Sequence, residues 1–262
     1  MFLLALALIF LSDRVVFGKP FMDPELLPEY FQGDIIGEPF RSRNGMTNEI
    51  YRWPNGIVHY IIKENHFSGS HYLEILKAMS IIEANSCIVF KPATKKERFK
   101  AVIIKSNGMG CNSYYLGFRN RTQVVNLQTY PLGEGCFRIG SIIHELLHVL
   151  GFEHQHVAQN RDEFVKIQWN NINPEYNINF LNTDTTTQWH DFGEEYDYES
   201  LMHYLPTAFS KNGQPTILAL KEGAVNMGQR HYLSEKDIRK LNKMYKCPGY
   251  DQEASIQKII LI

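Results

Sequence analysis

The stretch Ser141–His154, which reads SIIHELLHVLGFEH, decides the fold of this chain around one site. On an α-helix, residues four apart lie on one face, about one turn from each other. His144 and His148 can therefore offer two imidazoles to a single metal ion. Glu145 projects about 100° round the helix, where it can reach a metal-bound water and not the metal itself. The apolar residues between these groups would bury most of the helix.

The helix pattern continues to a third histidine. Gly151 is a favoured residue just past a helix end, because it takes positive φ without steric cost. The chain can turn there and bring His154 back to the same point, which completes the pattern HExxHxxGxxH. Three nitrogen ligands and one open position are the arrangement of a catalytic zinc site. The sequence therefore predicts one Zn²⁺ per chain.

The composition places few limits on function. The chain has 262 residues, enough for one sizeable domain or two small ones. Hydrophobic content of 44% and charged content of 21% are ordinary for a soluble globular protein. A formal charge of −1 gives no argument for a nucleic acid or an anionic membrane as partner, and neither is expected.

The N-terminus predicts a secreted protein. Phe2–Leu11 is an apolar run that is too short to span a bilayer as a helix and has the character of a signal-peptide core, although no basic residue precedes it. The small residues Val16 and Gly18 predict cleavage near Gly18, so residues 1–18 would be removed. The alternatives are a buried N-terminal helix and a membrane anchor.

Residues 19–43 contain four prolines and little periodicity, which indicates an extended segment outside the core. The segment ends in the basic, turn-rich string RSRNG at residues 41–45, an accessible site for a trypsin-like protease. We therefore predict a pro-segment at 19–43, cut after Arg43 by such a protease.

Hydrophobic periodicity predicts the elements of the remaining chain. Strand-like runs are Ile57–Ile62, Cys87–Phe90, Ala101–Lys105 and Gln123–Leu127. Helical spacing is seen in Ser68–Ser86 and in a closing helix that follows the capping box at Ser234. Between His154 and about Ser200 the chain is rich in Asn, Thr and Asp, so mostly loops and short turns are expected there.

Four cysteines are present, at Cys87, Cys111, Cys136 and Cys247. An even number in a secreted chain suggests two disulfides, for which three pairings are open. The absence of CxxC spacing argues against a zinc site made of cysteines.

A second motif narrows the identification. Ser200–Tyr204, read SLMHY, resembles the methionine turn beneath the metal of the metzincin metalloproteases. Together with HExxHxxGxxH, the preceding strands and helix and the four cysteines, it resembles the astacin family from about Phe31 to Cys247. That resemblance implies an α+β, two-subdomain fold. A twisted, mostly parallel sheet with two long helices would form the N-terminal half, and a loop-rich C-terminal half would end in a closing helix. It also implies a catalytic domain at 44–249 and a short tail at 250–262.

The resemblance further assigns roles and pairings to particular residues. It implies zinc ligands His144, His148 and His154, a general base and acid Glu145, a methionine turn at Met202, a movable extra ligand Tyr204 that stabilises the tetrahedral intermediate, and the disulfides Cys87–Cys247 and Cys111–Cys136.

The string FQGD at residues 31–34 matches the FxGD motif of the family's pro-segment. Asp34 would coordinate zinc where the catalytic water belongs and keep the zymogen inactive, because a carboxylate oxygen is a good zinc ligand. The matrix metalloproteases use a pro-segment cysteine instead. No cysteine precedes Cys87 here, which argues against them.

The chain departs from the family after the third histidine, at Gln155, Ala158 and Asn160. In the family a glutamate stands at the first of these positions and pairs with the new α-amino group after activation. Gln155 can accept one hydrogen bond from that group, but without charge assistance the contact is weaker. The trimmed N-terminus, expected at Asn44, should therefore be held less firmly here.

These features predict a secreted, zinc-dependent endopeptidase that hydrolyses internal peptide bonds of proteins and peptides. The chemistry would use a zinc-activated water and Glu145, and the chain would be a monomer made as a zymogen with an aspartate switch. The rivals are a secreted binding protein that keeps the metal for stability, against which the presence of Glu145 argues, and a metal-dependent hydrolase of a non-peptide bond. Asn120 begins a glycosylation sequon. The further histidines His156, His190 and His203 are expected to be structural or exposed.

Overall fold

The computed structural model describes residues 23–37, 49–182 and 191–250. Several predicted features lie outside these residues: the signal peptide at 1–18, the Arg43 cleavage site, the expected N-terminus Asn44, His190, and the tail beyond Tyr250.

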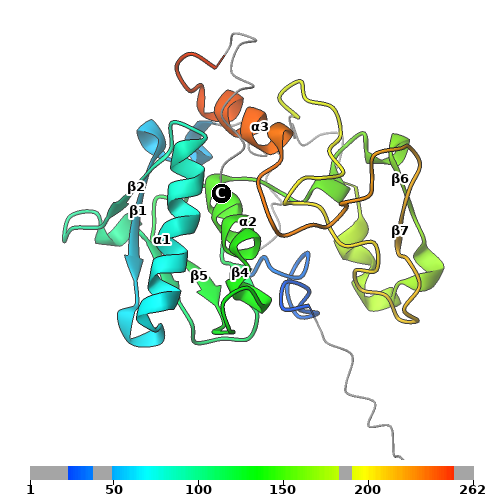
Figure 1. Ribbon diagram of the computed structural model, residues 1–262, viewed down its shortest axis with the longest axis horizontal. Coiled ribbons are helices and arrows are strands. Elements are labelled where there is room, and N and C mark those ends of the chain that lie inside the picture. Colours follow the sequence, from blue (N-terminus) through cyan, green and yellow to red (C-terminus); the bar gives the residue numbers. More distant parts are fainter. Residues whose placement is uncertain (1–22, 38–48, 183–190, 251–262) are drawn as a thin grey trace, which may run out of the picture.

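A five-stranded sheet forms one side of the N-terminal half (Figure 1). Its strands are β1 Ile57–Ile62, β2 Val89–Pro92, β3 Val102–Lys105, β4 Cys111–Ser113 and β5 Gln123–Leu127, in the order β2-β1-β3-β5-β4. The first four strands in this order run parallel to one another, and β4 pairs antiparallel with β5 at the edge. The predicted mostly parallel sheet is confirmed. The strand β4 was not predicted, because three residues carry no readable alternation.

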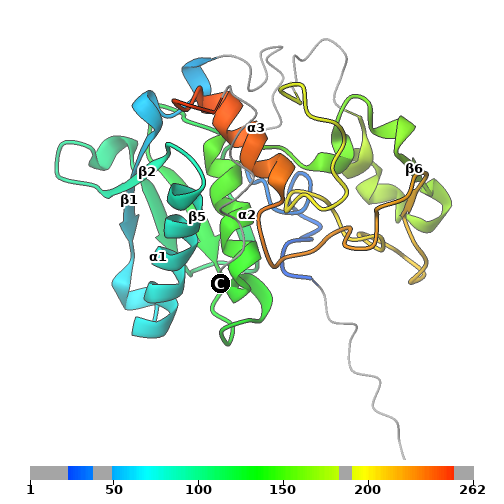
Figure 2. The ribbon, with the colours of Figure 1, turned by 45° about the horizontal axis from the view of Figure 1, so that its top comes forward.

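Three α-helices accompany the sheet: α1 Gly69–Ala84, α2 Ile139–Leu150 and α3 Glu235–Tyr245. Capping boxes begin α1 at Ser68 and α3 at Ser234, as the sequence predicted for α3. Helices α1 and α2 lie side by side over one face of the sheet, and α3 crosses the top of the molecule (Figures 1 and 2). Every residue of α2 except Ile139 is buried, which explains its apolar sequence on all sides.

The C-terminal half holds more regular structure than the sequence predicted. The strands β6 Val165–Ile167 and β7 Ile217–Ala219 form an antiparallel pair where only loops and turns were expected. Strands this short are set by their pairing with a distant part of the chain, which local sequence does not reveal. A second hydrophobic core of this half contains the aromatic residues Phe180, Tyr196 and Tyr204.

Short 3₁₀ helices connect these elements, at Glu49–Tyr51, Pro54–Gly56, Glu64–His66, Arg98–Lys100, Gly135–Phe137, Gln155–Val157, Arg161–Glu163, Trp169–Asn171 and Pro174–Phe180. Two disulfides tie distant parts of the chain, one joining Cys87 to Cys247 and the other Cys111 to Cys136. In the part of the chain that the structure describes, no helix has the length and apolarity needed to cross a bilayer.

Residues 23–37 lie between the two halves and beside α2 in both ribbon views (Figures 1 and 2), and next to β4 in Figure 1. The segment continues the sheet beyond its edge strand. Ser113 donates its main-chain N–H to the main-chain oxygen of Asp34 at 2.8 Å, and Ile36 donates to that of Ser113 at 3.0 Å. Ile35 thereby forms a parallel bridge to Ser113. This pairing holds Asp34 in place beside α2.

Candidate metal centre and active site

Four buried side chains converge at one point between the two halves: Asp34, His144, His148 and His154. Oδ2 of Asp34 lies 3.0 Å from Nε2 of His144 and 3.0 Å from Nε2 of His154. Its Oδ1 lies 3.4 Å from Nε2 of His148. The structure thus brings together the three histidines that the sequence predicted as ligands and the aspartate that it predicted as their partner.

The spacing of these atoms fits a metal ion. Nε2 of His144 and Nε2 of His154 are 3.2 Å apart, and all four ligand atoms lie within 4.8 Å of one another. A tetrahedral zinc site with bonds of about 2.0 Å has ligand atoms about 3.3 Å apart. Among the described residues, Oδ1 of Asp34 and Nε2 of His148 are buried without a hydrogen-bond partner. Buried polar atoms of this kind need a partner, and a zinc ion would satisfy both at once.

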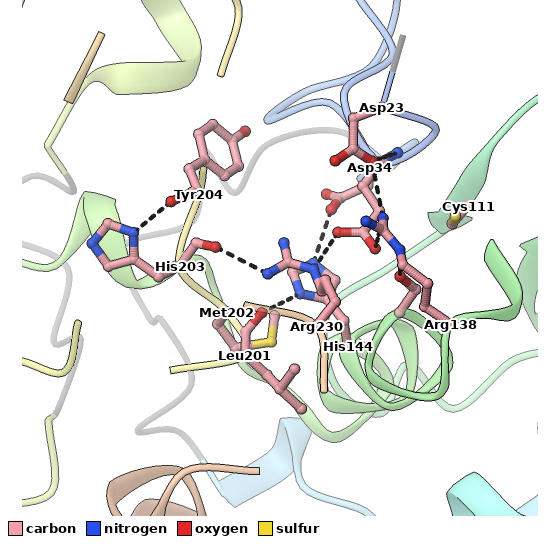
Figure 3. Close-up of polar contacts among 12 residues, drawn as sticks. Asp23, Asp34, Cys111, Arg138, His144, Leu201, Met202, His203, Tyr204 and Arg230 are labelled. Carbon is pink, nitrogen blue, oxygen red and sulfur yellow. Dashed lines mark hydrogen bonds and ion pairs between the residues drawn. The ribbon is translucent and has the colours of Figure 1, made fainter. Parts of the chain in front are cut away.

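Each histidine is oriented by a hydrogen bond from its other ring nitrogen. Nδ1 of His144 lies 2.8 Å from the main-chain oxygen of Leu201 (Figure 3), and Nδ1 of His148 lies 2.7 Å from that of Phe152. A carbonyl oxygen only accepts, so both Nδ1 atoms must carry the proton. The Nε2 lone pairs are then free to face the metal, as ligating imidazoles require.

The third histidine is oriented differently. Nδ1 of His154 lies 2.7 Å from Oε1 of Gln32, a side chain of the segment 23–37. The chain reaches this position because Gly151 ends α2 at φ 109°, in the left-handed region that glycine adopts without cost. Local turn chemistry thus places His154, and a distant segment orients it.

The pKa values of the cluster follow from burial and from the facing groups. Burial lowers the pKa of His154 to about 3, so that the imidazole is neutral and able to ligate at neutral pH. Burial alone would raise the pKa of Asp34, but the facing His154 and His148 hold it well below its usual range. The structure therefore favours an ionised Asp34 facing a neutral His154, the protonation states that metal binding needs.

Glu145 lies on α2 between the two helical histidines and is fully buried. Neither carboxylate oxygen has a hydrogen-bond partner among the described residues. Burial, followed by the charge of Asp34, raises the pKa of Glu145 well above its usual range. A carboxylate in such a site binds a proton readily, which is the property of a general base.

Tyr204 and Met202 both lie in the loop that passes beneath the cluster. The Tyr204 hydroxyl donates to the main-chain oxygen of Gln32 at 2.6 Å, and its ring centroid is 4.7 Å from that of His154. Met202 is buried in the N-terminal core, and its main-chain oxygen accepts from Gln155 N–H at 2.8 Å. The predicted methionine turn is thus hydrogen-bonded directly to the residue after the third histidine.

Helix α3 braces this loop. One oxygen of Asp237 accepts from the Ser200 hydroxyl at 2.6 Å, and the other accepts from Leu201 N–H at 2.8 Å. The Leu201 oxygen in turn accepts from His144, so a single residue joins α3 to a histidine of the cluster. The closing helix therefore positions the site, a role that its capping box alone did not suggest.

The side chain of Gln155 already has a partner in the untrimmed chain. Its Oε1 accepts from the buried ammonium of Lys240 at 2.6 Å. Gln155 was predicted to accept from the trimmed N-terminus, a residue outside the described ranges. Lys240 competes for the same oxygen, an interaction that the sequence did not reveal.

Several other residues of the site had no assigned place from the sequence, although Arg230 was a candidate to line a subsite. Arg230 donates Nε to Oε2 of the buried Glu25 at 2.5 Å, and Arg138 donates to the other oxygen of Glu25 at 3.3 Å and to Asp23 at 3.2 Å. Figure 3 shows Arg230 and Arg138 close to Asp23 and Asp34 of the segment 23–37. Nothing local marked Glu25, which follows a proline in an aperiodic stretch.

Gln32 and Asn179 are two further site residues to which the sequence assigned no role. Gln32 stood inside the FQGD string without an assigned role, and Asn179 lies in the Asn-rich stretch.

The remaining predicted residues lie apart from the cluster or support it. His156 and His203 are buried, with Nε2 of His156 against the main-chain oxygen of Asn179 at 2.9 Å and Nδ1 of His203 against that of Tyr204 at 2.8 Å. Asn120 is exposed, on a turn where its φ is 51°. Its position leaves the sequon open to solvent.

Comparison with known proteins identifies the family. The profile described as Astacin, a peptidase family, matches residues 45–246. The chain belongs to the astacin family. Its metal cluster accordingly belongs to a zinc metalloproteinase, and the enzyme hydrolyses peptide bonds with zinc as cofactor.

Relatives of this astacin cover nearly its whole length. Seminal metalloprotease 1 of Drosophila melanogaster is 66% identical over 242 residues, which cover 92% of this chain and 96% of the relative. Zinc metalloproteinase nas-14 of Caenorhabditis elegans is 37% identical over 239 residues, 90% of this chain but 45% of that longer protein. Among solved structures, high choriolytic enzyme 1, a hatching-enzyme zinc protease from Oryzias latipes, matches with a TM-score of 0.67 at 32% identity, covering 76% of this chain and 96% of that one. The α+β architecture therefore has a parallel in a zinc protease of known structure.

Proposed function

We propose that this astacin is a secreted endopeptidase made as a latent chain, in which Asp34 takes the coordination position that the catalytic water needs. The observation that carries this proposal is the position of Oδ2 of Asp34, 3.0 Å from Nε2 of both His144 and His154. A carboxylate so placed would complete a set of four ligands with the three histidines and would leave no open position for water on a bound zinc ion.

The residues around the cluster support peptide hydrolysis once Asp34 has left. When bound, zinc would be held by His144, His148 and His154, and it would acidify a water and polarise the peptide carbonyl. Glu145 takes the proton from the attacking water and delivers it to the leaving amine. Its buried carboxylate, which has no hydrogen-bond partner among the described residues, suits this role. The Tyr204 hydroxyl, which donates to a main-chain oxygen in the latent chain, then donates to the developing oxyanion.

The proposal carries the predicted boundaries with it. Residues 1–18 would be a signal peptide, 19–43 the pro-segment, 44–249 the catalytic domain and 250–262 a tail, with cleavage after Arg43 by a trypsin-like protease. The two disulfides support an oxidising, extracellular compartment. The mature enzyme would act as a monomer on proteins and peptides, and its exposed Asn120 would be open to glycosylation.

Cleavage of a broad peptide library by three proteins tests the proposal: the chain trimmed at Arg43, the untrimmed chain, and the trimmed Glu145→Ala variant. Each is assayed with a chelator and again after zinc is restored. Zinc-dependent cleavage by the trimmed wild-type chain alone is the expected result. Equal cleavage before and after trimming would refute the block by Asp34. One equivalent of bound zinc without any cleavage would instead favour a binding protein.

A further inference from the structure

Two side chains of the C-terminal half bind the main-chain N–H and the main-chain oxygen of Gln32. Its main-chain N–H donates to Oδ1 of Asn179 at 2.9 Å, and its main-chain oxygen accepts from the Tyr204 hydroxyl at 2.6 Å. Gln32, Asn179 and Tyr204 are all at most 2% exposed. Residues 23–37 cover the site and are called the covering segment below. Side chains of the C-terminal half thus bind both the main-chain donor and the main-chain acceptor of one residue of this segment.

The residues that carry this acceptor and this donor, Asn179 and Tyr204, are linked through His156. The main-chain oxygen of Asn179 accepts from Nε2 of His156 at 2.9 Å, and the ring of His156 stacks on that of Tyr204 with centroids 3.7 Å apart. The next main-chain oxygen, of Phe180, accepts from the buried Arg161 at 2.6 Å. None of these contacts involves residues 23–37. The main chain at Asn179 and the ring of Tyr204 are therefore held by residues outside the segment that covers them.

Oδ1 of Asn179 and the hydroxyl of Tyr204 together bind a main chain and no particular side chain. A carboxamide oxygen and a phenolic hydroxyl match the N–H and the C=O that every peptide residue other than proline presents. If the covering segment leaves, Oδ1 of Asn179 loses this partner and is open to another donor. Another peptide in the same place would satisfy it again.

From this geometry we infer that Asn179 is a substrate-binding residue. Its Oδ1 accepts the main-chain N–H of the substrate residue whose carbonyl receives the Tyr204 hydroxyl. That residue lies on the N-terminal side of the cleaved bond. The inference rests on the proposed function, in which the segment carrying Asp34 is removed and Tyr204 donates to the scissile carbonyl.

The consequence is a test in which enzyme and substrate are changed together. The full chain is folded with zinc and trimmed at Arg43, as wild type, as Asn179→Ala and as Asn182→Ala. Asn182 is a matched control, because it lies three residues on and, among the described residues, its side chain donates to the main-chain oxygen of Gln159 and not to the covering segment. Each enzyme cleaves a parent peptide and a series in which single N–H groups near the cleaved bond are replaced by ester oxygens.

Wild type and Asn182→Ala should lose about tenfold in kcat/KM when the ester replaces the N–H of the residue preceding the cleaved bond. Asn179→Ala should show about that loss already on the parent peptide and little further loss with the ester. Zinc content and thermal midpoint, measured on all three, separate binding from folding. If Asn179→Ala does not fold, Asn179→Asp, which keeps an acceptor oxygen, should retain the wild-type sensitivity to the ester.

Two outcomes overturn the inference. In the first, trimmed Asn179→Ala cleaves the parent peptide within twofold of wild type, and the untrimmed variant cleaves it faster than untrimmed wild type does. Asn179 would then bind only the covering segment and not the substrate. Alternatively, wild type and Asn179→Ala could respond equally to the ester at that position. Failure of trimmed wild type to cleave any peptide is a separate result. It would contradict the proposed function, and no kcat/KM values would exist to compare between the variants.

Discussion

Nδ1 of His154 donates its proton to the side-chain oxygen of Gln32, at 2.7 Å, although 122 residues separate the two in the chain. The corresponding nitrogens of His144 and His148 are held by main-chain oxygens of Leu201 and Phe152. The covering segment thus supplies the outer hydrogen-bond partner of one predicted metal ligand, in addition to the carboxylate of Asp34.

Loss of that partner should weaken zinc retention in the untrimmed chain. Gln32→Ala removes the side-chain acceptor and keeps the main-chain bonds to Asn179 and Tyr204. Because outer hydrogen bonds typically change metal affinity by about 10- to 100-fold, zinc loss to a competing chelator should be about tenfold faster. Gln32→Glu keeps an acceptor oxygen and should behave as wild type. Equal rates of zinc loss from Gln32→Ala and wild type would show that the hydrogen bond between Gln32 and His154 contributes nothing to zinc retention.

Replacing Asp34 should release activity without trimming. Asp34→Ala removes the carboxylate that faces the three histidines and opens a coordination position. The main-chain bonds of Gln32 still hold the segment, so we expect partial release, about tenfold above the untrimmed wild type. Glu29→Ala is the control, since Glu29 is exposed on the same segment. The measurement is peptide cleavage by each untrimmed chain. Absence of cleavage by untrimmed Asp34→Ala would contradict the block of the site by Asp34.

Glu145→Gln should separate metal binding from catalysis. The amide has nearly the shape of the carboxylate but cannot accept the proton of the attacking water. Turnover by the trimmed enzyme should fall by about 10²- to 10⁴-fold, while one zinc remains bound. Zinc content by atomic absorption and peptide cleavage are measured on the same sample. Near-normal cleavage by Glu145→Gln would assign the base to another group.

The buried Asp237 should make stability depend on pH in a defined direction. Burial, followed by the charge of Asp197, raises the pKa of Asp237 from 3.8 to about 6. The folded chain therefore keeps a proton that the unfolded chain loses, and the free energy of unfolding falls as pH rises from about 4 to about 6. The shift corresponds to at most about 3 kcal/mol.

Asp237→Asn should remove this part of the pH dependence, because the amide oxygen can still accept from Leu201 N–H while the amide NH2 donates to the Ser200 hydroxyl, without a charge. Urea-unfolding midpoints of wild type and variant, compared between pH 4 and pH 7, should diverge as pH rises, with the variant more stable at pH 7. Asp162→Asn, at an exposed residue, should follow wild type. Parallel curves for wild type and Asp237→Asn would refute the prediction.

The sequence by itself determined the features that arise within a few turns of chain. The spacing of His144, His148 and His154, and the glycine between them, predicted the ligand set because helical periodicity and left-handed backbone are local properties. The parallel strands and the capped closing helix followed from the same kind of pattern, although β2 at Val89–Pro92 begins two residues after its predicted start at Cys87. The strands β4, β6 and β7 did not, because three residues carry no period.

Only the tertiary structure decided which distant groups complete the site. Glu25 and Arg230 are 205 residues apart, and Gln32 and Asn179 are 147 apart. Gln155 meets Lys240 from a different helix. Such contacts depend on how the two halves close around residues 23–37, and no local preference encodes that. A polar side chain in a loop looks the same in sequence whether it faces water or orients a buried ligand, since burial is a property of the packed molecule.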